Sequence, residues 1–376
     1  MPGGPSAILR PVPPTTLRAR LQSTGIRRLG GPRNGFRYRR ADGGRPSAAD
    51  LARIAALRIP PAWRPVTIAR SPGAKLQAVG LDAAGRWQYL YRASHTARRA
   101  RAKFDRLIAF IEALPALRRT LHRDLAREGL PLEKGLAGSI LLLAACALRS
   151  GAEVYARDHG TFGLATLRPQ HVEIAGECIR LRFRGKHRVI QRHQIRSRHL
   201  ARLLGEMKRL PGRELLKYRD TRGRARDIGR RHLVAYVKRA MGARFVARDF
   251  RTWAATLLCA AALRREARAT RGRTAVASRT RAAAALGRES AASPDRAIAR
   301  ALRETAAHLG NTPAVVRESY VHPGLLRAFE RGRVVSHALP SADALSGRRS
   351  ASLERAERAL VTLLRAEKRG RRGGSA

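Results

Sequence analysis

Residues 179–195 read IRLRFRGKHRVIQRHQI, and this stretch decides the fold of the region around it. Apolar side chains at Ile179, Leu181 and Phe183 alternate with arginines, a period of two that is typical of a strand with one buried and one exposed face. Gly185 begins a tight turn, after which residues 189–195 can return as the partner strand. The pattern predicts an antiparallel hairpin whose exposed face is basic.

Helical patterns lie on both sides of this hairpin. Apolar residues at 104, 107, 108 and 111 share one face of a helix, which we expect to end by Pro115. Residues 132–148 form a second, mostly apolar helical pattern that Gly151 closes. Three more helices are predicted from their ends: one over 233–241 with Asp227 as N-cap, one capped by Asp249, and one from Thr312-Pro313 to Pro323. Residues 96–332 should therefore form a mainly helical domain with a small antiparallel sheet, an α+β fold.

The two ends of the chain have a different character. Residues 36–95 predict a small β-rich domain, because short apolar runs at 66–68, 76–79 and 87–91 alternate with turn signals. Residues 1–35 are rich in Pro, Gly and Arg and are expected to form a flexible basic arm. Residues 265–300 are of low complexity and predict a partly helical linker. Residues 333–376 predict an Arg-rich tail, largely disordered apart from one helix over 353–364.

The chain carries a large excess of positive charge. Lys and Arg number 78 and Asp and Glu number 27, so the formal net charge is +51. Such a chain repels itself unless it meets a polyanion, and nucleic acid is the partner that this charge indicates. Compositional drift in a GC-rich genome would explain the preference for Arg over Lys, but it does not explain the excess itself.

Several other classes of protein find no support in the sequence. The start, MPGGPSAILRPVPP, lacks the apolar segment of a secretory signal, and the longest apolar stretch, 140–148, is far too short to span a bilayer, so we expect a cytoplasmic protein with no membrane partner. Cys146, Cys178 and Cys259 show no C-x-x-C pairing and the histidines lack ligand spacing, so no metal site is expected. Neither a Walker loop nor G-x-G-x-x-G occurs, so no small-molecule cofactor is expected.

The cationic side chains could serve phosphoryl transfer. That reaction needs a positioned nucleophile and fixed positive charge around the equatorial oxygens of the phosphate. Arginine can bond two of these oxygens at once, lysine can deliver a proton to the leaving oxygen, and tyrosine can form a phosphotyrosine linkage. Composition alone cannot choose among 78 Lys and Arg residues.

Five blocks of sequence, in the same order, resemble the poxvirus-like and bacterial type IB DNA topoisomerases. The blocks are LRSGAEVY at 148–155 with FGLATL at 162–167, FRGK at 183–186, RDFRTW at 248–253, LGNTP at 309–313, and SY at 319–320. Shorter segments of the front domain are also similar to the family: IPPAW at 59–63, LQAVG at 76–80 and QYLY at 88–91. The resemblance covers about residues 25–330.

The resemblance implies a fold and a reaction. The β-rich domain at 36–95 would bind DNA, the catalytic domain would span 96–332, and the two would close as a C-shaped clamp around duplex DNA. Tyr320 would attack a DNA phosphate, form a 3′-phosphotyrosine intermediate and later be displaced by religation. Supercoils would relax without ATP or metal, and the protein would act as a nucleoid-associated monomer.

The resemblance also implies roles for individual side chains. Arg149 and Arg251 would bind the non-bridging oxygens, Lys186 would be the general acid for the 5′ oxygen, and Asn311, where many relatives have His, would donate a hydrogen bond to the phosphate. The implied DNA contacts near the cleavage site are Gln88, Tyr89, Tyr91, Tyr155 and Arg248. One departure from the family is the turn after Lys186, which is shorter than usual.

Plainer interpretations of the same residues stay open. Tyr320 could be an ordinary amphipathic-helix residue, Arg149 could neutralise a helix dipole, and Lys186 could be a solvated turn residue. Gln88, Tyr89 and Tyr91 alternate along a strand, so their side chains could form a packed face instead of a DNA-binding one. Two other functions also remain: a tyrosine recombinase or integrase, although these usually carry H-x-x-R where this chain has RDFR, and a DNA-compacting protein that has lost catalysis.

Overall fold

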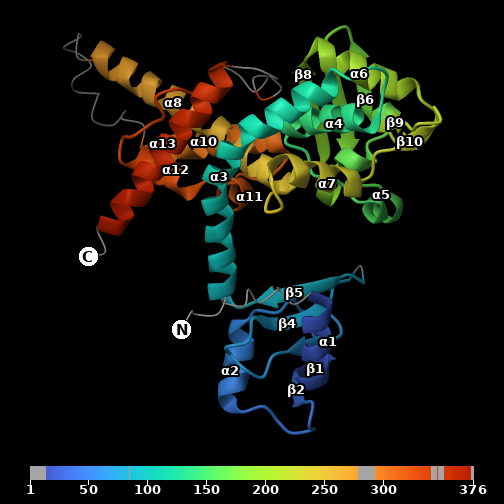
Figure 1. Cartoon of the computed structure of the whole chain (residues 1–376). Coiled ribbons are helices and arrows are strands. Elements are labelled where there is room, and N and C mark those ends of the chain that lie inside the picture. The colour runs from blue at the N-terminus through green and yellow to red at the C-terminus, as the bar shows by residue number, and fades with distance from the viewer. Residues whose placement is uncertain (1–13, 84, 278–292, 340–344, 346–350, 374–376) are drawn as a thin grey trace, which may run out of the picture. The chain divides into compact units, whose positions relative to one another are not determined.

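The computed structural model describes residues 14–83, 85–277, 293–339, 345 and 351–373 (Figure 1). The chain divides into two compact units, Met1–Ala102 and Lys103–Ala376. The helix α3 (Ala93–Leu125) runs through the boundary between them. No helix within the described ranges is both long enough and apolar enough to cross a membrane.

The first unit is built on a five-stranded antiparallel sheet of order β2-β1-β3-β4-β5. Its strands are β1 (Ile26–Gly31), β2 (Gly35–Arg40), β3 (Val66–Ile68), β4 (Leu76–Leu81) and β5 (Trp87–Tyr91). The three strands predicted between residues 66 and 91 are therefore confirmed.

Two helices, α1 (Pro14–Thr24) and α2 (Ala48–Ala56), cover opposite faces of this sheet. Ile54 of α2 packs with Ala78, whereas Leu21 of α1 packs with Val79, and successive residues of a strand point to opposite faces. The prediction of a flexible arm over 1–35 is wrong from residue 14 onward, because Leu21 and Ile26 are buried. Residues 1–13 lie outside the described part of the chain.

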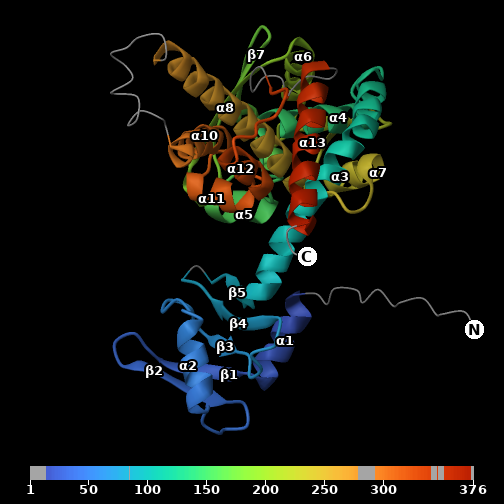
Figure 2. The same cartoon turned by 90° about the vertical axis from the view of Figure 1, so that its left-hand side faces the viewer.

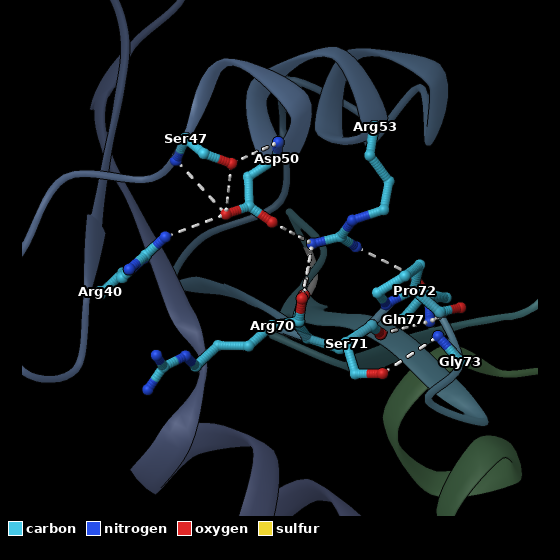
Figure 3. A network of polar contacts seen from close by, with 10 residues as sticks. Arg40, Ser47, Asp50, Arg53, Arg70, Ser71, Pro72, Gly73 and Gln77 are labelled. Atoms are coloured by element: carbon cyan, nitrogen blue, oxygen red, sulfur yellow. Dashed lines mark hydrogen bonds and ion pairs between the residues drawn. The ribbon is translucent and has the colours of Figure 1, made fainter.

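A polar network fixes α2 to the sheet (Figure 3). Ser47 and Asp50 form a reciprocal capping box at the N-terminus of α2, and Arg40 donates to the same carboxylate at 3.3 Å. Arg53 extends the network by donating to Gln77 Oε1 at 3.1 Å and to a backbone carbonyl of the loop between β3 and β4. Hydrogen bonds to charged groups are the stronger ones, so this network holds the loop before β4 in place.

The second unit contains the predicted basic hairpin. Strands β6 (Val172–Ala175), β7 (Cys178–Arg184) and β8 (Ile190–Arg196) form an antiparallel sheet in that order. Ile179, Leu181 and Phe183 are buried, as the alternating pattern predicted. Their face packs against helices α4 (Leu132–Cys146) and α6 (Arg198–Arg209), as Figure 1 shows.

Helix α3 continues through Pro115, where the sequence predicted its end. A proline inside a helix costs about 3 kcal/mol or more. The apolar face nevertheless continues beyond it, with Leu117, Leu121 and Leu125 each almost fully buried. Burial of these leucines offsets the lost hydrogen bond and explains why the helix does not stop.

Further helices surround the sheet and carry most of the site. They are α5 (Glu153–His159), α7 (Arg230–Met241), α8 (Ala247–Ala277), α10 (Pro294–Leu309), α11 (Pro313–Ser319) and α12 (Pro323–Glu330), with a short β9 (Lys217–Arg219) and β10 (Ala225–Asp227) hairpin before α7.

The predicted helix ends are partly wrong. Asp227 ends β10 and does not cap α7, whose N-cap is Gly229. Asp249 lies inside the first turn of α8, where its side chain accepts the Val246 N–H at 2.9 Å. Pro323 begins a new helix instead of ending the one before it.

The predicted linker over 265–300 is helical at both ends, in α8 and α10, and residues 278–292 between them lie outside the described part. Arg300 on α10 bonds both oxygens of Glu266 on α8, at 2.9 and 2.6 Å.

The helix predicted over 353–364 is confirmed and is longer than expected, as α13 (Ala351–Gly373), so the prediction of disorder is wrong for residues 351–352 and 365–373. Leu353, Leu360 and Leu364 share one buried face of it. The helix lies against α3 (Figure 2), where Glu357 bonds both nitrogens of Arg118 at 2.7 and 2.9 Å. Opposite charges and an apolar stripe thus hold an Arg-rich segment on the core.

Candidate active site around Tyr320

Arg149 follows the end of α4, on a strained and closely packed segment. Ala147 adopts a left-handed conformation, with φ 46°, and turns the chain away from the helix. The Leu164 N–H then donates to the Arg149 carbonyl at 2.8 Å. Gly151 has φ +76°, and a Cβ on Gly163 would lie 2.6 Å from the Gly151 nitrogen. The glycines of the two neighbouring motifs are needed for this approach, which fixes the backbone that carries Arg149.

Arg251 reaches the same place from the first turn of α8. Its side chain is buried, with the residue 3% exposed. The guanidinium donates to the carbonyls of Ala147 and Leu309, the latter at 3.2 Å, and to Asn311 Oδ1 at 3.1 Å. Burial, helped by the charge of Arg149, lowers the pKa of Arg251 to about 10. The side chain therefore keeps its charge at neutral pH.

Asn311 lies directly after the end of α10. Gly310 closes that helix with φ +59°, and a Cβ there would overlap the Gln191 side chain. The Asn311 Oδ1 accepts from Arg251 and also from Arg149, at 2.8 Å. Because both partners can only donate, the amide oxygen must face them, and the Nδ2 group points elsewhere.

Tyr320 follows α11, whose N-cap Thr312 accepts the Val315 N–H at 3.3 Å, as the sequence predicted. The ring of Tyr320 is buried, with the residue 7% exposed. The guanidinium carbons of Arg251 and Arg248 lie 4.8 Å and 5.7 Å from its centre. These contacts place positive charge against the ring from α8.

The electrostatics of the site lower the pKa of the Tyr320 phenol. Burial tends to raise the pKa of Tyr320, but the charges of Arg251, Arg149 and Arg248 outweigh it, so the pKa lies below its ordinary value. Opposite charge within a few ångströms favours the ionised form in this way. A phenol with a lowered pKa is a better nucleophile at neutral pH.

Two buried donors at this place have no partner among the described residues: Arg251 Nε and Asn311 Nδ2. Buried polar groups are normally hydrogen-bonded, so unpaired donors beside Tyr320 need an explanation. A bound anion with several acceptor oxygens, such as a phosphodiester, would satisfy both.

The structure does not bring every predicted residue to this centre. Lys186 is exposed in a short 3-10 turn at the tip of the β7–β8 hairpin, followed by positive φ values of 61° at His187 and Arg188. Among the described residues, no contact joins Lys186 to Tyr320. Tyr155 lies on α5, exposed and beside His159.

The predicted residues of the first unit lie on β5. Tyr89 and Tyr91 stack with ring centres 6.4 Å apart and are half-buried against the cluster that α1 covers. Gln88, on the other face, donates to Asp82 at 2.8 Å. These contacts fit the packed-face interpretation for the two tyrosines as well as a role in binding.

Two supporting side chains were not predicted from the sequence. The Thr256 hydroxyl on α8 accepts the His322 N–H at 3.2 Å, and its one proton faces the Thr252 carbonyl at 2.7 Å, with the Tyr320 carbonyl 3.3 Å away. Lys103 on α3 donates to the carbonyls of Ser319 and Glu318, at 2.8 and 3.4 Å. Both act on the backbone next to Tyr320, and contacts to backbone leave no motif in a sequence.

Comparisons with known proteins match both units of the chain. The family model described as the catalytic core of eukaryotic DNA topoisomerase I matches residues 92–331, and the model for the N-terminal domain of bacterial DNA topoisomerase IB matches residues 35–82. DNA topoisomerase 1B of Acanthamoeba polyphaga mimivirus is 34% identical over 223 residues, which are 58% of this chain and 66% of that protein.

Poxvirus proteins are also similar. DNA topoisomerase 1B of Vaccinia virus (strain Copenhagen) and DNA topoisomerase I of Monkeypox virus are each 30% identical over 118 residues, 31% of this chain and 37% of theirs. The chain thus spans a little under two thirds of the mimivirus protein and about a third of the poxvirus proteins. Since the catalytic-core model covers more than half of the chain, the chain belongs to the type IB DNA topoisomerase family.

Proposed function

We propose that this protein relaxes supercoiled DNA by transient cleavage of one strand, without ATP or metal. Tyr320 attacks a phosphodiester and becomes joined to the 3′ end, the 5′ oxygen leaves, and the returning 5′ hydroxyl reseals the strand. The observation that supports this best is the buried Tyr320 ring against two guanidiniums, beside two buried donors that have no partner in the described part of the chain. That arrangement fits a phosphorus centre with negative oxygens around it.

The side chains would divide the work as follows. Arg149, Arg251 and Asn311 bind the non-bridging oxygens, and the phenol of Tyr320 is the nucleophile. Lys186 protonates the leaving 5′ oxygen, which requires bound DNA to bring the hairpin tip to the phosphate. Gln191, one residue pair from the turn of that hairpin, donates to the Gly310 carbonyl at 3.5 Å and so links the hairpin to the Asn311 loop.

We further propose that both units contact duplex DNA as a C-shaped clamp formed by one monomer. Gln88, Tyr89 and Tyr91 would face DNA from the first unit, and Tyr155 and Arg248 from the second. Arg248 is exposed, and its guanidinium also lies near the Tyr320 ring. It would therefore contact a DNA phosphate and Tyr320 at the same time. In the cell we expect the protein to be associated with the nucleoid.

Plasmid relaxation in EDTA, with Tyr320→Phe beside the wild type, tests this proposal. We expect the wild type to relax the plasmid and to yield a covalent DNA adduct whose attached peptide contains Tyr320. The phenylalanine variant should do neither, because it has no nucleophilic oxygen. Tyr218→Phe is a matched control, since Tyr218 is half-buried on β9 beside His232 and remote from the site.

Each other result has a clear meaning. Relaxation by Tyr320→Phe would reject Tyr320 as the nucleophile. DNA binding without an adduct in the wild type would favour a compacting protein. An adduct that leads to strand exchange between paired sites, without relaxation, would favour a recombinase.

A further inference from the structure

Lys103 meets the end of α11 at the point where the chain delivers Tyr320. Its ammonium donates to the carbonyl of Ser319 at 2.8 Å and to that of Glu318 at 3.4 Å. The last carbonyls of a helix have no partner within the helix, and a cation there is favoured by the helix dipole. Lys103 is 215 and 216 residues away from its two partners, so the contact ties α3 to the nucleophile's own segment.

The backbone around Tyr320 is held from two sides. The Thr256 hydroxyl on α8 accepts the His322 N–H at 3.2 Å, and Lys103 on α3 donates to the two carbonyls before Tyr320. α11 has only seven residues, and such a short helix holds little shape on its own. Contacts from neighbouring helices must therefore set the direction in which the phenol points.

We propose that Lys103 is a positioning residue for strand cleavage: its charged ammonium holds the end of α11 so that Tyr320 faces the phosphate. This inference rests on the function proposed above. Lys103 touches neither the phosphate nor the phenol in this assignment, and it acts through the backbone of Ser319 and Glu318. A small error in the direction of a nucleophile is enough to slow its attack.

The surroundings of Lys103 make its charge sensitive to pH. Burial first, then the charge of Arg248 on α8 and that of Arg106 on α3, lowers the pKa of Lys103 to about 8, while Tyr320 and Glu318 act in the opposite direction. Below that pH the ammonium is charged and its hydrogen bonds are strong. Above that pH the neutral amine is a weaker donor, so the hydrogen bonds that hold the end of α11 weaken as the pH rises.

The test compares Lys103→Met and Lys103→Arg with the wild type in single-turnover cleavage of a duplex that traps the covalent adduct. We expect Lys103→Met to cleave about 10- to 100-fold more slowly, as expected for the loss of a charged hydrogen bond. Its affinity for the duplex should not change. Lys103→Arg should cleave within about threefold of the wild type, because its guanidinium can donate to the same carbonyls.

A second measurement follows the rate with pH. The ratio of wild-type rate to Lys103→Arg rate should fall between about pH 7 and about pH 9, because only lysine loses its proton there. Titration of Tyr320 affects both proteins, so it changes the ratio only through its coupling to the charge at position 103. This measurement decides the question even if Lys103→Met does not fold.

Lys208→Met is the matched control. Lys208 on α6 also donates to a backbone carbonyl, that of Val172 at 2.8 Å, but lies away from Tyr320. We expect it to cleave at the wild-type rate. Cleavage by Lys103→Met at that rate would overturn the inference, and so would a slow Lys103→Arg whose ratio to wild type is flat with pH. A wild type that forms no adduct would reject the proposed function, and this inference with it.

Discussion

Asn311 combines two tasks in one side chain. Its oxygen holds Arg149 and Arg251, and its Nδ2 group has no partner among the described residues. Asn311→Ala removes the donor and also frees the two arginines. We expect cleavage to slow by about 10²- to 10³-fold, the usual effect of losing one donor to developing charge. Single-turnover formation of the covalent adduct measures this directly.

Asn311→Asp separates the two tasks. The carboxylate can still accept from both arginines, but it cannot donate, and its charge opposes the phosphate. Adduct formation should be at least as slow as in Asn311→Ala, while thermal stability stays near that of the wild type. An aspartate variant as fast as the wild type would show that the amide does not bind the phosphate.

Individual site residues could be named from the sequence only where a motif carries them. The ordered blocks pointed to Arg149, Arg251, Asn311 and Tyr320, and the structure brings these four side chains together. Lys103 could not be found in this way. Its partners are two backbone carbonyls far along the chain, and a backbone group has no residue type that a pattern could match.

At the scale of elements, the contact between α13 and α3 depends on one buried ion pair. Glu357 is bonded by Arg118 and also accepts from Trp253 Nε1 at 3.0 Å. The side chain of Glu357 is only 4% exposed, and that of Arg118 is 14% exposed. Glu357→Leu leaves a buried guanidinium without a partner, so we expect the free energy of unfolding to fall by about 3–5 kcal/mol. Thermal or denaturant unfolding checks it.

Two further variants test whether burial of the ion pair causes this loss of stability. Burial keeps the pKa of Glu357 above its ordinary value despite Arg118, so the carboxylate is costly where it lies. The double variant Arg118→Met, Glu357→Leu should therefore recover most of the stability. The exposed pair Arg365–Glu112 joins the same two helices, and Glu112→Gln should cost less than about 1 kcal/mol. Equal losses in Glu357→Leu and Glu112→Gln would contradict the argument.

Two segments that were predicted to be disordered are folded for the same physical reason. α1 lies in a segment rich in Pro, Gly and Arg, and α13 extends beyond the helix predicted over 353–364 into an Arg-rich end, and these compositions were taken as a sign of disorder. In α13 the apolar residues Leu353, Leu360 and Leu364 still recur at helical spacing, and they are buried. Long arginine side chains can remain in water while a narrow stripe packs, so charge alone does not exclude a folded segment. The hairpin at 179–195 was easier, because its first strand alternates apolar and arginine residues and Gly185 marks the turn.

At the scale of the whole molecule, the charge of +51 is costly to the folded state and must serve a partner. The exposed face of the β7–β8 hairpin shows this locally. Arg182 lies directly opposite Arg192 in the strand register, and both side chains are exposed. Like charges placed across two strands are destabilising. Such a pair is expected where a polyanion offsets the repulsion.

The double variant Arg182→Gln, Arg192→Gln should therefore change two properties in opposite directions. The free energy of unfolding without DNA should rise, by up to about 1 kcal/mol, because the repulsion is gone. The slope of log Kd for duplex DNA against log salt should become shallower by about 2, one for each lost phosphate contact. The control Arg157→Gln, Arg198→Gln removes the same charge, but each of these arginines already has a carboxylate partner, at 2.8 and 2.7 Å. A salt slope that changes equally in both variants would mean that DNA responds only to net charge, and an unchanged slope in the first would remove this face from the binding surface.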